Sequence, residues 1–301
     1  MKPFQAGDYW TFCEGLAAVR QNDKWGYIDH EGHFAIPPQF SDAAGFSEGL
    51  AVIEVKKKYG YIDKTGSIVI APRFDFANPF TEGVAVVYLN SRHLIIDKQG
   101  NTLIKLDDSF TDVESFSDGL APAEINLEKY GYINHAGEVV IPPQYDYVTP
   151  FTDGLAIVNI GDKYGYIDTT GNQVMPPQFD DAEYFSEEVA PVRKDGSWRF
   201  VDHNGEIQIL LGDRFDYVNC LTEGRAVVQV GEKYGAIDKS GNLLIEARFD
   251  QLNFFTEGLA YARIGNIHGF INPSGSFEIQ KPVPQRTLLD RLLGRNKFLQ
   301  W

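Results

Sequence analysis

The sequence is poor in the residues and runs that would place it in a specialised class. Its 301 residues include only two cysteines, Cys13 and Cys220, which cannot build a disulfide framework, and no CxxC pair or Cys/His cluster has the spacing of metal ligands. No segment reaches the roughly 18 uninterrupted apolar residues of a membrane span, and residues 1–10 hold no apolar run of a signal peptide. We therefore expect a cytoplasmic protein without a membrane span, a metal or a cofactor.

Positive charge is also scarce. Lys and Arg number 27 against 42 Asp and Glu, and the formal net charge is -15 at pH 7. Binding to a phosphate backbone requires a concentration of Lys and Arg, so this balance argues against a nucleic-acid partner and favours a neutral or basic one. No G-x-S-x-G, P-loop or HExxH motif occurs, so we predict no catalytic residues.

The sequence does contain an internal repeat, and such a repeat determines the fold that the sequence predicts. Eight copies of one unit follow one another at steps of 34, 34, 36, 35, 34, 36 and 34 residues. They begin at Phe12, Phe46, Phe80, Phe116, Phe151, Phe185, Leu221 and Phe255. Most open with the cluster F-[ST]-[ED]-G, in which small polar residues and Gly mark a turn. The repeat array is predicted to cover residues 1–282.

Each unit predicts short strands and no helix, since no copy holds ten or more residues at helical period. A first strand, such as residues 50–55, and a second strand with an aromatic-Gly pair, such as residues 25–29, are predicted to form a hairpin. A D-x-x-G or N-x-x-G turn leads to a third strand, such as residues 138–141, whose pairing Pro142-Pro143 is predicted to end. The F-D-x-A segment, as at residues 179–182, is predicted to be an extended or bulged connector. The unit is therefore all-β, with three strands, or four if the connector pairs.

The two ends of the array leave its shape open. The last copy stops after residues 276–279 without a connector, whereas residues 3–12 resemble residues 37–46, which precede the second copy. A closed ring would use such a split, as many β-propellers do, but so would an open array whose unit begins at the connector. Because a unit of about 34 residues is short for a four-stranded blade, we predict a curved, solenoid-like array, with a closed propeller-like ring as the alternative.

Residues 283–301 depart from the repeat and are predicted to form a basic, amphipathic C-terminal helix and tail. Leucines recur on one face from Thr287, the expected N-cap. This helix either caps the open edge of the last unit or docks on a partner or another copy of the chain, and attachment to a membrane surface is the weakest option. Its candidate contact residues are Leu288, Leu289, Arg291, Leu292 and Leu293.

Three motifs recur in order in most copies, F-[ST]-[ED]-G-L-A, then [KR]-[WY]-G-[YF]-I-[DN], then x-x-G-x-x-[VI]-I-P-P-x-[FY]-D. Over about residues 12–282, this combination resembles the WG repeat family, also called KWG repeats, which is common in bacterial proteins. Trp25-Gly26 is the one literal Trp-Gly pair, and Tyr59-Gly60 and its counterparts keep an aromatic residue. The resemblance implies a repeat scaffold that mediates interactions, with no general catalytic residues.

The repeated polar and aromatic residues each allow a structural and a functional interpretation. The Asp or Asn before x-x-G could line up carboxylates for Ca²⁺, but its position predicts that it caps its own turn. The acid of F-[ST]-[ED]-G is interpreted as a turn residue too. The aromatic-Gly pairs could stack on sugars or peptides. We prefer packing in the core, with the ring of a neighbouring unit against the glycine backbone.

The third and sixth copies depart from the pattern in the same way. They replace the Lys-aromatic-Gly and lose the Pro-Pro pair. A duplicated three-unit block explains this without function, because the third and sixth copies start 105 residues apart, as do the second and fifth. The alternative is that residues 91–109 and 194–213 form a recognition surface, since binding tends to occur where loops depart from the scaffold. The candidate partner-binding residues there are Arg92, His93, Trp198 and Arg199.

These observations predict a non-catalytic repeat scaffold that mediates protein–protein interaction. The first alternative is a module that binds carbohydrate or cell-wall fragments through the recurrent aromatic residues. The second is a hydrolase of unknown type, supported only by the abundant acids. A protein partner is expected, its identity is left open, and a small-molecule ligand is not expected.

Overall fold

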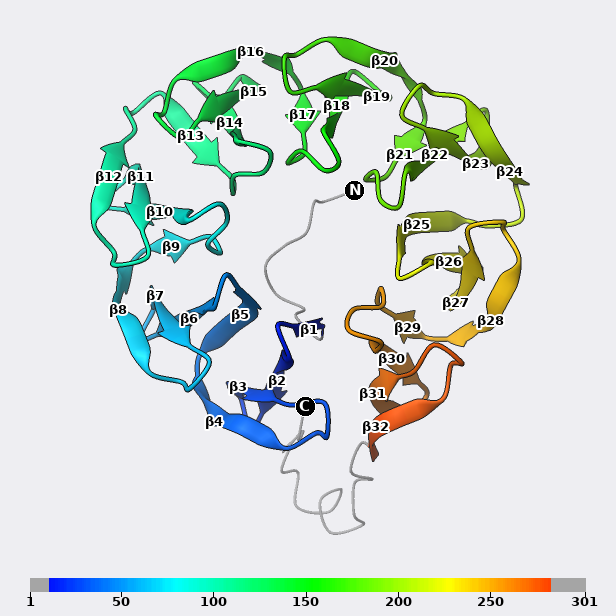
Figure 1. Ribbon diagram of the computed structural model, residues 1–301, viewed down its shortest axis with the longest axis horizontal. Coiled ribbons are helices and arrows are strands. Elements are labelled where there is room, and N and C mark those ends of the chain that lie inside the picture. The colour runs from blue at the N-terminus through cyan, green and yellow to red at the C-terminus, as the bar shows by residue number, and fades with distance from the viewer. Residues whose placement is uncertain (1–10, 283–301) are drawn as a thin grey trace, which may run out of the picture.

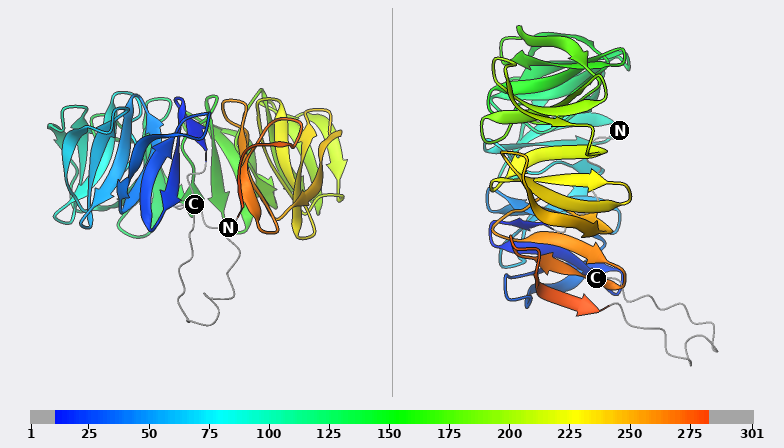
Figure 2. Two further views of the ribbon diagram at one scale, coloured as in Figure 1. Left: turned by 90° about the horizontal axis from the view of Figure 1, so that it is seen from below. Right: turned by 90° about the vertical axis from the view of Figure 1, so that its right-hand side faces the viewer.

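The computed structural model describes residues 11–282, which form eight four-stranded antiparallel sheets. The sheets stand as blades around a central channel and close into a ring (Figure 1). Seen from the side, the ring is a flat disc (Figure 2). The fold is an eight-bladed β-propeller, so the predicted all-β class and the eight repeats are confirmed. The predicted open solenoid is wrong, and the closed ring that was the alternative is correct.

The blades are numbered 1 to 8 along the chain, and each runs from an inner strand at the channel to an outer strand at the rim (Figure 1). Blade 1 holds β1 (Phe12–Cys13), β2 (Leu16–Gln21), β3 (Lys24–Ile28) and β4 (Phe34–Phe40). Blade 2 holds β5 (Asp42–Ser47), β6 (Leu50–Val55), β7 (Lys58–Asp63) and β8 (Ile68–Phe74). Blade 3 holds β9 (Phe76–Ala77), β10 (Val84–Leu89), β11 (Arg92–Asp97) and β12 (Thr102–Lys105). Blade 4 holds β13 (Phe110–Val113), β14 (Leu120–Ile125), β15 (Lys129–Asn134) and β16 (Val139–Tyr145).

The second half of the ring repeats this order. Blade 5 holds β17 (Tyr147–Val148), β18 (Leu155–Ile160), β19 (Lys163–Asp168) and β20 (Gln173–Phe179). Blade 6 holds β21 (Asp181–Ala182), β22 (Val189–Lys194), β23 (Ser197–Asp202) and β24 (Ile207–Gly212). Blade 7 holds β25 (Tyr217–Thr222), β26 (Arg225–Val230), β27 (Lys233–Asp238) and β28 (Leu243–Phe249). Blade 8 holds β29 (Gln251–Leu252), β30 (Ala260–Ile264), β31 (Ile267–Ile271) and β32 (Phe277–Pro282).

The three predicted strands of a unit are the second, third and outer strands of a blade, and the predicted connector supplies the inner strand of the next blade. A prediction about proline is wrong: β16 runs through Pro142 and Pro143 and continues to Tyr145. Proline is tolerated there because an outer strand has one free edge, where no N–H group is needed. The predicted C-terminal helix lies outside the described residues. Within residues 11–282 no helix is long and apolar enough to cross a membrane.

The glycine of the aromatic-Gly pair is required by a close approach of backbone. A Cβ at Gly60 would lie 2.5 Å from the carbonyl oxygen of Ile70 in the outer strand of the same blade. The outer strand bulges over this point, since pairing passes from Tyr61↔Ile70 directly to Tyr59↔Phe74. The expectation that a ring from a neighbouring unit covers the glycine is therefore wrong.

In the two altered copies, the glycine and the three-residue bulge are lost together. In blades 3 and 6, Leu94 and Arg199 replace the glycine, and Leu94 pairs with Lys105 and Arg199 with Leu210. Without Pro-Pro and the three-residue bulge, the outer strand leaves space for a side chain. The joint loss of both features is thus one structural change.

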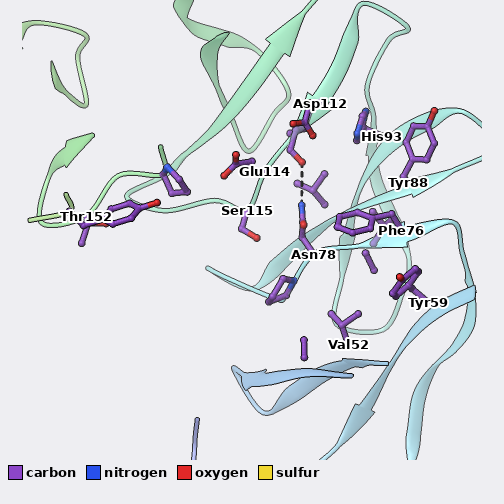
Figure 3. Close-up of a pocket in the computed structure, with 18 of the residues that line it drawn as sticks. Val52, Tyr59, Phe76, Asn78, Tyr88, His93, Asp112, Glu114, Ser115 and Thr152 are labelled. Carbon is purple, nitrogen blue, oxygen red and sulfur yellow. Dashed lines mark hydrogen bonds between the residues drawn. The ribbon is translucent and has the colours of Figure 1, made fainter. Parts of the chain in front are cut away.

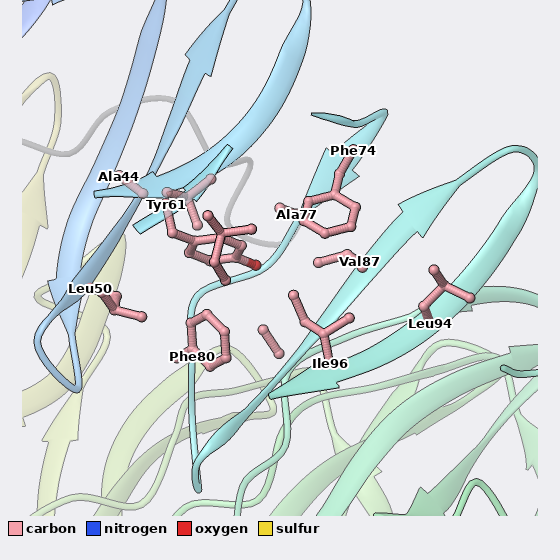
Figure 4. Close-up of a cluster of buried hydrophobic side chains, with 12 residues drawn as sticks. Ala44, Leu50, Tyr61, Phe74, Ala77, Phe80, Val87, Leu94 and Ile96 are labelled. Carbon is pink, nitrogen blue, oxygen red and sulfur yellow. The ribbon is translucent and has the colours of Figure 1, made fainter. Parts of the chain in front are cut away.

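Neighbouring blades are joined by an aromatic core. Between blades 2 and 3, Tyr61 and Phe80 are both fully buried, with ring centroids 4.7 Å apart (Figure 4). The Tyr61 hydroxyl donates to the carbonyl oxygen of Asn78 at 2.7 Å, which satisfies its polar end. Tyr61, which follows the glycine, is thus a core residue. The aromatic residue before the glycine was predicted to pack in the core; Trp25 does so, whereas Tyr59 is half-buried and lines the channel cavity.

The turn between the inner and second strands also joins neighbouring blades. Glu48 and Gly49 have φ values of 53° and 84° and form a two-residue hairpin loop of the type that needs two positive φ angles. The acid side chain of this turn accepts a hydrogen bond from a backbone N–H of the next blade. We call these seven acids the acid belt; Glu14, Glu48, Glu82, Asp118, Glu187, Glu223 and Glu257 bind the N–H groups of Gly49, Gly83, Gly119, Gly154, Gly224, Gly258 and Gly15, respectively.

The acid belt and the core close the ring between blades 8 and 1. Both Glu257 carboxylate oxygens accept from the Gly15 N–H, at 2.9 and 3.0 Å, and Phe12 packs on Phe270 with centroids 4.9 Å apart. Blade 8 takes all four strands from residues 251–282, so no described strand from the start of the chain completes it. The expected pairing of residues 3–10 with residues 276–279 lies outside the described residues.

Candidate functional site: the central channel

The channel holds a cavity of about 1070 Å³, lined by residues of blades 2 to 8 among the described residues (Figure 3). Its described lining includes three carboxylates, Asp42, Asp112 and Glu114, and no Lys or Arg. Aromatic side chains from five blades also line it, namely Tyr59, Phe76, Tyr88, Tyr147, Tyr184, Phe185 and Phe254. The site is thus acidic and aromatic.

Successive side chains of an inner strand point in opposite directions, which places some of these acidic and aromatic residues on the channel wall. One residue of each strand is buried in the core, such as Ala77 and Val113, and the residue before it is half-buried or exposed towards the channel. Those preceding residues are of four types, Asp, Phe, Tyr and Gln; they are Asp42, Phe76, Asp112, Tyr147, Asp181, Tyr217 and Gln251, and the first four line the cavity. The channel wall is therefore chemically uneven, although the backbone around it repeats.

Glu114 is the most unusual group on this wall. Its side chain is half-buried, and burial, followed by the charge of Asp112, raises its pKa to about 7. Its backbone N–H donates to the carbonyl oxygen of Pro122, which holds the residue in place. Among the described residues, no hydrogen bond or ion pair reaches its carboxylate.

Two tyrosines lie near Glu114. Tyr147 of blade 5 and Tyr184 of blade 6 both line the cavity and are half-buried. Burial is the main reason that their pKa values are raised, and the nearby charge of Glu114 contributes to both. Both phenols are therefore neutral near pH 7.

Glu183 of blade 6 occupies the position that Glu114 has in blade 4, but it has a partner. The Tyr217 hydroxyl donates to its carboxylate, and burial and the charge of Asp181 raise its pKa to about 7 despite this bond. Burial, followed by the charge of Glu183, raises the pKa of Cys220 to about 12, so this thiol is not reactive at neutral pH.

Blade 3, which is next to blade 4, contributes apolar and neutral groups to the channel wall. His93 is buried, its ring lies 4.9 Å from that of Tyr88, and burial lowers its pKa, so it is neutral at pH 7. Asn78 donates through Nδ2 to the carbonyl oxygen of Val113 at 3.2 Å, which ties blade 3 to blade 4 at the channel (Figure 3). Phe76 is 43% exposed, a large apolar surface in the cavity.

The structure does not bring the predicted partner-binding residues together. Of the four in blades 3 and 6, only His93 lines the cavity. Arg92 is exposed and forms an ion pair with Asp108, and Arg199 is half-buried, with Nη2 donating to the carbonyl oxygen of Lys194. Trp198 is fully buried against Tyr217, with centroids 5.7 Å apart, so its predicted contact with a partner is wrong: it has no free surface. Residues Leu288, Leu289, Arg291, Leu292 and Leu293 lie outside the described residues.

Sequence reasoning missed the channel residues. Glu114, Tyr147 and Tyr184 lie in or after the segments that were interpreted as connectors, and they meet only because the ring closes. The available signal was that these connector positions vary in a sequence that otherwise repeats.

The Asp and Asn residues before x-x-G cap their turns, as predicted. Asp63 Oδ1 accepts from the N–H groups of Thr65 and Ser67 at 2.9 and 3.0 Å. The same bonds occur in every blade. Among residues 11–282, no group of three or more His, Cys, Asp or Glu side chains is arranged to hold a metal ion.

A comparison of the sequence with protein families agrees with this repeat. The profile described as "WG containing repeat" matches eight times, over residues 7–25, 25–59, 59–92, 95–126, 130–164, 164–198, 198–234 and 234–266. The chain belongs to the WG-repeat family. Six of the eight matches in this WG-repeat protein begin at the aromatic residue of a third strand, so the family unit takes parts of two adjacent blades.

Solved structures show the same fold at low sequence identity. BamB from Moraxella catarrhalis has a TM-score of 0.55 and 11% identity, covering 88% of this chain and 93% of its own. A eukaryotic initiation factor has a TM-score of 0.63 and 10% identity, covering 93% and 89%. Hsv2p from Kluyveromyces lactis has a TM-score of 0.51 and 10% identity, covering 77% and 92%. At these identities the likeness shows the fold alone. No curated protein matches the chain.

Proposed function

We propose that this WG-repeat protein is a non-catalytic scaffold that binds a partner protein at its central channel. One observation carries the proposal: the residues that join the blades repeat around the ring, whereas the equivalent inner-strand residues on the cavity wall change among acidic, apolar and phenolic groups, as at Asp112, Phe76 and Tyr147. Side chains that only hold the ring together can be the same in each blade. A surface that recognises one shape and charge pattern needs different groups at different points.

The composition of the channel supports a protein partner. Aromatic side chains such as the exposed Phe76 and the half-buried Tyr184 provide apolar area with few rotatable bonds, which is the kind of group that dominates binding energy at protein interfaces. The carboxylates beside them favour a partner that carries positive charge. The partner's identity and a cytoplasmic setting stay predictions.

The hydrolase alternative is favoured by one observation. A cavity with a carboxyl group whose pKa is about 7, as at Glu114, is what a general acid requires. We rank it below the scaffold because the second such carboxyl, Glu183, is already bound by the Tyr217 hydroxyl. Release of product from a panel of chromogenic glycosides and esters, lost on Glu114→Gln, would establish the hydrolase.

The scaffold is tested by capture from the native cell with two matched variants. Phe76→Ser removes an exposed apolar side chain from the channel, and Leu210→Ser removes one that is 66% exposed on the outer strand of blade 6. We expect the wild-type protein and Leu210→Ser to enrich the same protein reproducibly and Phe76→Ser to lose it. Equal capture by both variants, or no reproducible protein with any of the three, contradicts the proposal.

A further inference from the structure

We propose that the part of the channel wall formed by Glu114, Tyr147 and Tyr184 receives an Arg or Lys side chain from a peptide segment of the partner. The inference rests on the proposed function and names the chemistry of the contact. It concerns blades 4, 5 and 6, which supply one of these residues each.

The first step is charge. The described lining of the cavity contains Asp42, Asp112 and Glu114 and no cationic side chain. Negative groups that share a cavity with low-dielectric walls raise the local concentration of cations and exclude anions. An anionic or phosphorylated segment is therefore disfavoured.

The second step is the contrast between two equivalent carboxylates. Glu183 accepts a hydrogen bond from the Tyr217 hydroxyl, whereas no described side chain bonds or pairs with Glu114. A half-buried carboxylate without a partner is costly when it is ionised. A guanidinium or ammonium group from outside the chain would supply the missing partner and gain a charge-assisted hydrogen bond.

The third step is the pair of tyrosines. Tyr147 and Tyr184 line the same cavity as Glu114, and the charge of Glu114 contributes to the raised pKa of both phenols. A cation beside Glu114 would be close to these aromatic faces, which attract Arg and Lys through the ring quadrupole. Carboxylate and aromatic faces together distinguish an organic cation from a metal ion, which requires several oxygen ligands.

The fourth step is size. A cavity of about 1070 Å³ is far larger than one cationic group, and its other walls carry Phe76, Tyr59 and Tyr88. These side chains can cover apolar residues that flank the basic one in a peptide. The space therefore fits a segment of chain better than a small free amine.

Binding of a fluorescein-labelled octapeptide tests the inference. The peptide carries arginines spaced by glycine and serine, and its matched control carries citrulline, a neutral isostere, at the same positions. Fluorescence anisotropy is measured with the intact protein, with Glu114→Gln and with Glu128→Gln, which removes the same charge from the exposed turn between β14 and β15. A Tyr184→Leu variant removes one ring, and thermal unfolding of each variant confirms that it is folded.

We expect saturable binding of the arginine peptide, at least tenfold weaker binding of the citrulline peptide, a loss of about tenfold or more on Glu114→Gln and no more than twofold on Glu128→Gln. Tyr184→Leu should lose severalfold. Equal binding of the two peptides, or equal losses on the two Gln substitutions, overturns the inference, because diffuse charge would explain the binding.

The basic segment at residues 286–297 of this chain is the rival occupant. If the intact protein fails to bind the arginine peptide and a chain ending at residue 282 binds it, the channel serves the protein's own tail and the partner assignment is wrong. Equal binding by both chains supports the inference. The proposed function fails separately: capture of the native partner that depends on Phe76 but not on Glu114 keeps the scaffold and removes only the cation site.

Discussion

The acid belt and the channel wall are built from neighbouring residues of the same repeat, yet they differ in what they repeat. In the acid belt, a Glu or Asp in a turn of the same backbone geometry accepts a hydrogen bond from a backbone N–H of the next blade, and this bond occurs seven times. On the channel wall, equivalent positions hold groups as different as Phe76, Asp112 and Tyr147. In this chain, the repeated residues close the ring, and the varied residues form the surface that lines the channel.

The largest expected effect comes from the glycine beneath the outer strand. In Gly165→Ala, the new Cβ would lie 2.5 Å from the Met175 carbonyl oxygen and 2.7 Å from the Pro177 nitrogen, and backbone cannot move away cheaply. We expect a loss of about 3 kcal/mol or more in the free energy of unfolding. Urea unfolding followed by tryptophan fluorescence measures it.

The control for this prediction is Gly161→Asn, a change at an exposed turn where a Cβ meets nothing within 4 Å. Its φ of 61° suits Asn, so we expect a change below about 1 kcal/mol. Equal losses in the two variants would show that the outer strand does not press on Gly165.

The second prediction concerns the pH dependence that the channel wall imposes. Burial raises the pKa of Glu114 from 4.5 to about 7, so the folded protein keeps this proton over a pH range in which the unfolded chain has lost it. The contribution of Glu114 to stability must then fall as pH rises from about 4.5 to about 7. The groups that face this carboxyl are Asp112, Tyr130, Tyr132, Tyr147 and Tyr184.

Glu114→Gln removes this titration. We expect it to stabilise the protein by about 3 kcal/mol at pH 8 relative to its effect at pH 4, where the wild-type carboxyl is mostly protonated in both states. The four tyrosines have raised pKa values and stay neutral over this range, so they do not obscure the result. Parallel pH curves for the wild-type and substituted proteins would show that Glu114 is not desolvated by the channel.

The third prediction compares Glu223, an acid of the belt, with Asp153, the equivalent turn acid of blade 5. Both carboxylate oxygens of Glu223 accept from the Gly258 N–H at 3.1 Å, whereas among the described residues no such bond joins Asp153 to the backbone of Glu188. We expect Glu223→Ala to cost about 1 kcal/mol and Asp153→Ala to cost less than about 0.5 kcal/mol. Thermal unfolding at one pH compares them, and equal costs would mean that the inter-blade bond contributes nothing.

The smallest expected effect is a gain in stability at Glu188, to whose backbone Asp153 makes no bond among the described residues. Glu188 has a φ of 73°, where every other copy of this turn has glycine, and a side chain in this region is strained. We expect Glu188→Gly to raise the free energy of unfolding by about 0.5 to 1 kcal/mol. A decrease would show that the Glu188 side chain makes a contact worth more than the strain.

The local part of this structure could be predicted from the sequence because its causes are local. Asp63 caps the turn that follows it, and Glu48-Gly49 forms its turn from two adjacent residues. The ring could not be predicted from the repeat length. A blade fits in about 34 residues here because its hairpin loops, such as residues 56–57, have only two residues and an inner strand such as β9 is two residues long.

The candidate site could not be predicted from the sequence, for a different reason. Glu114, Tyr147 and Tyr184 are 33 to 70 residues apart, and nothing in their local sequence marks them as neighbours. Trp198 and Arg199 were predicted to bind a partner because they break the repeat, but that break accompanies a shorter bulge of the outer strand. Departure from a repeat indicates function only where the departing side chain has a free surface.

The central claim is that repeated positions hold the ring and varied positions bind the partner. It is tested most directly by the affinity of the purified partner for Phe76→Ser and for Glu223→Ala, measured by calorimetry with the wild-type protein as reference. We predict that Phe76→Ser weakens binding at least tenfold with little loss of stability, whereas Glu223→Ala lowers stability and leaves the affinity unchanged. Weakened binding in Glu223→Ala together with unchanged binding in Phe76→Ser would contradict the claim.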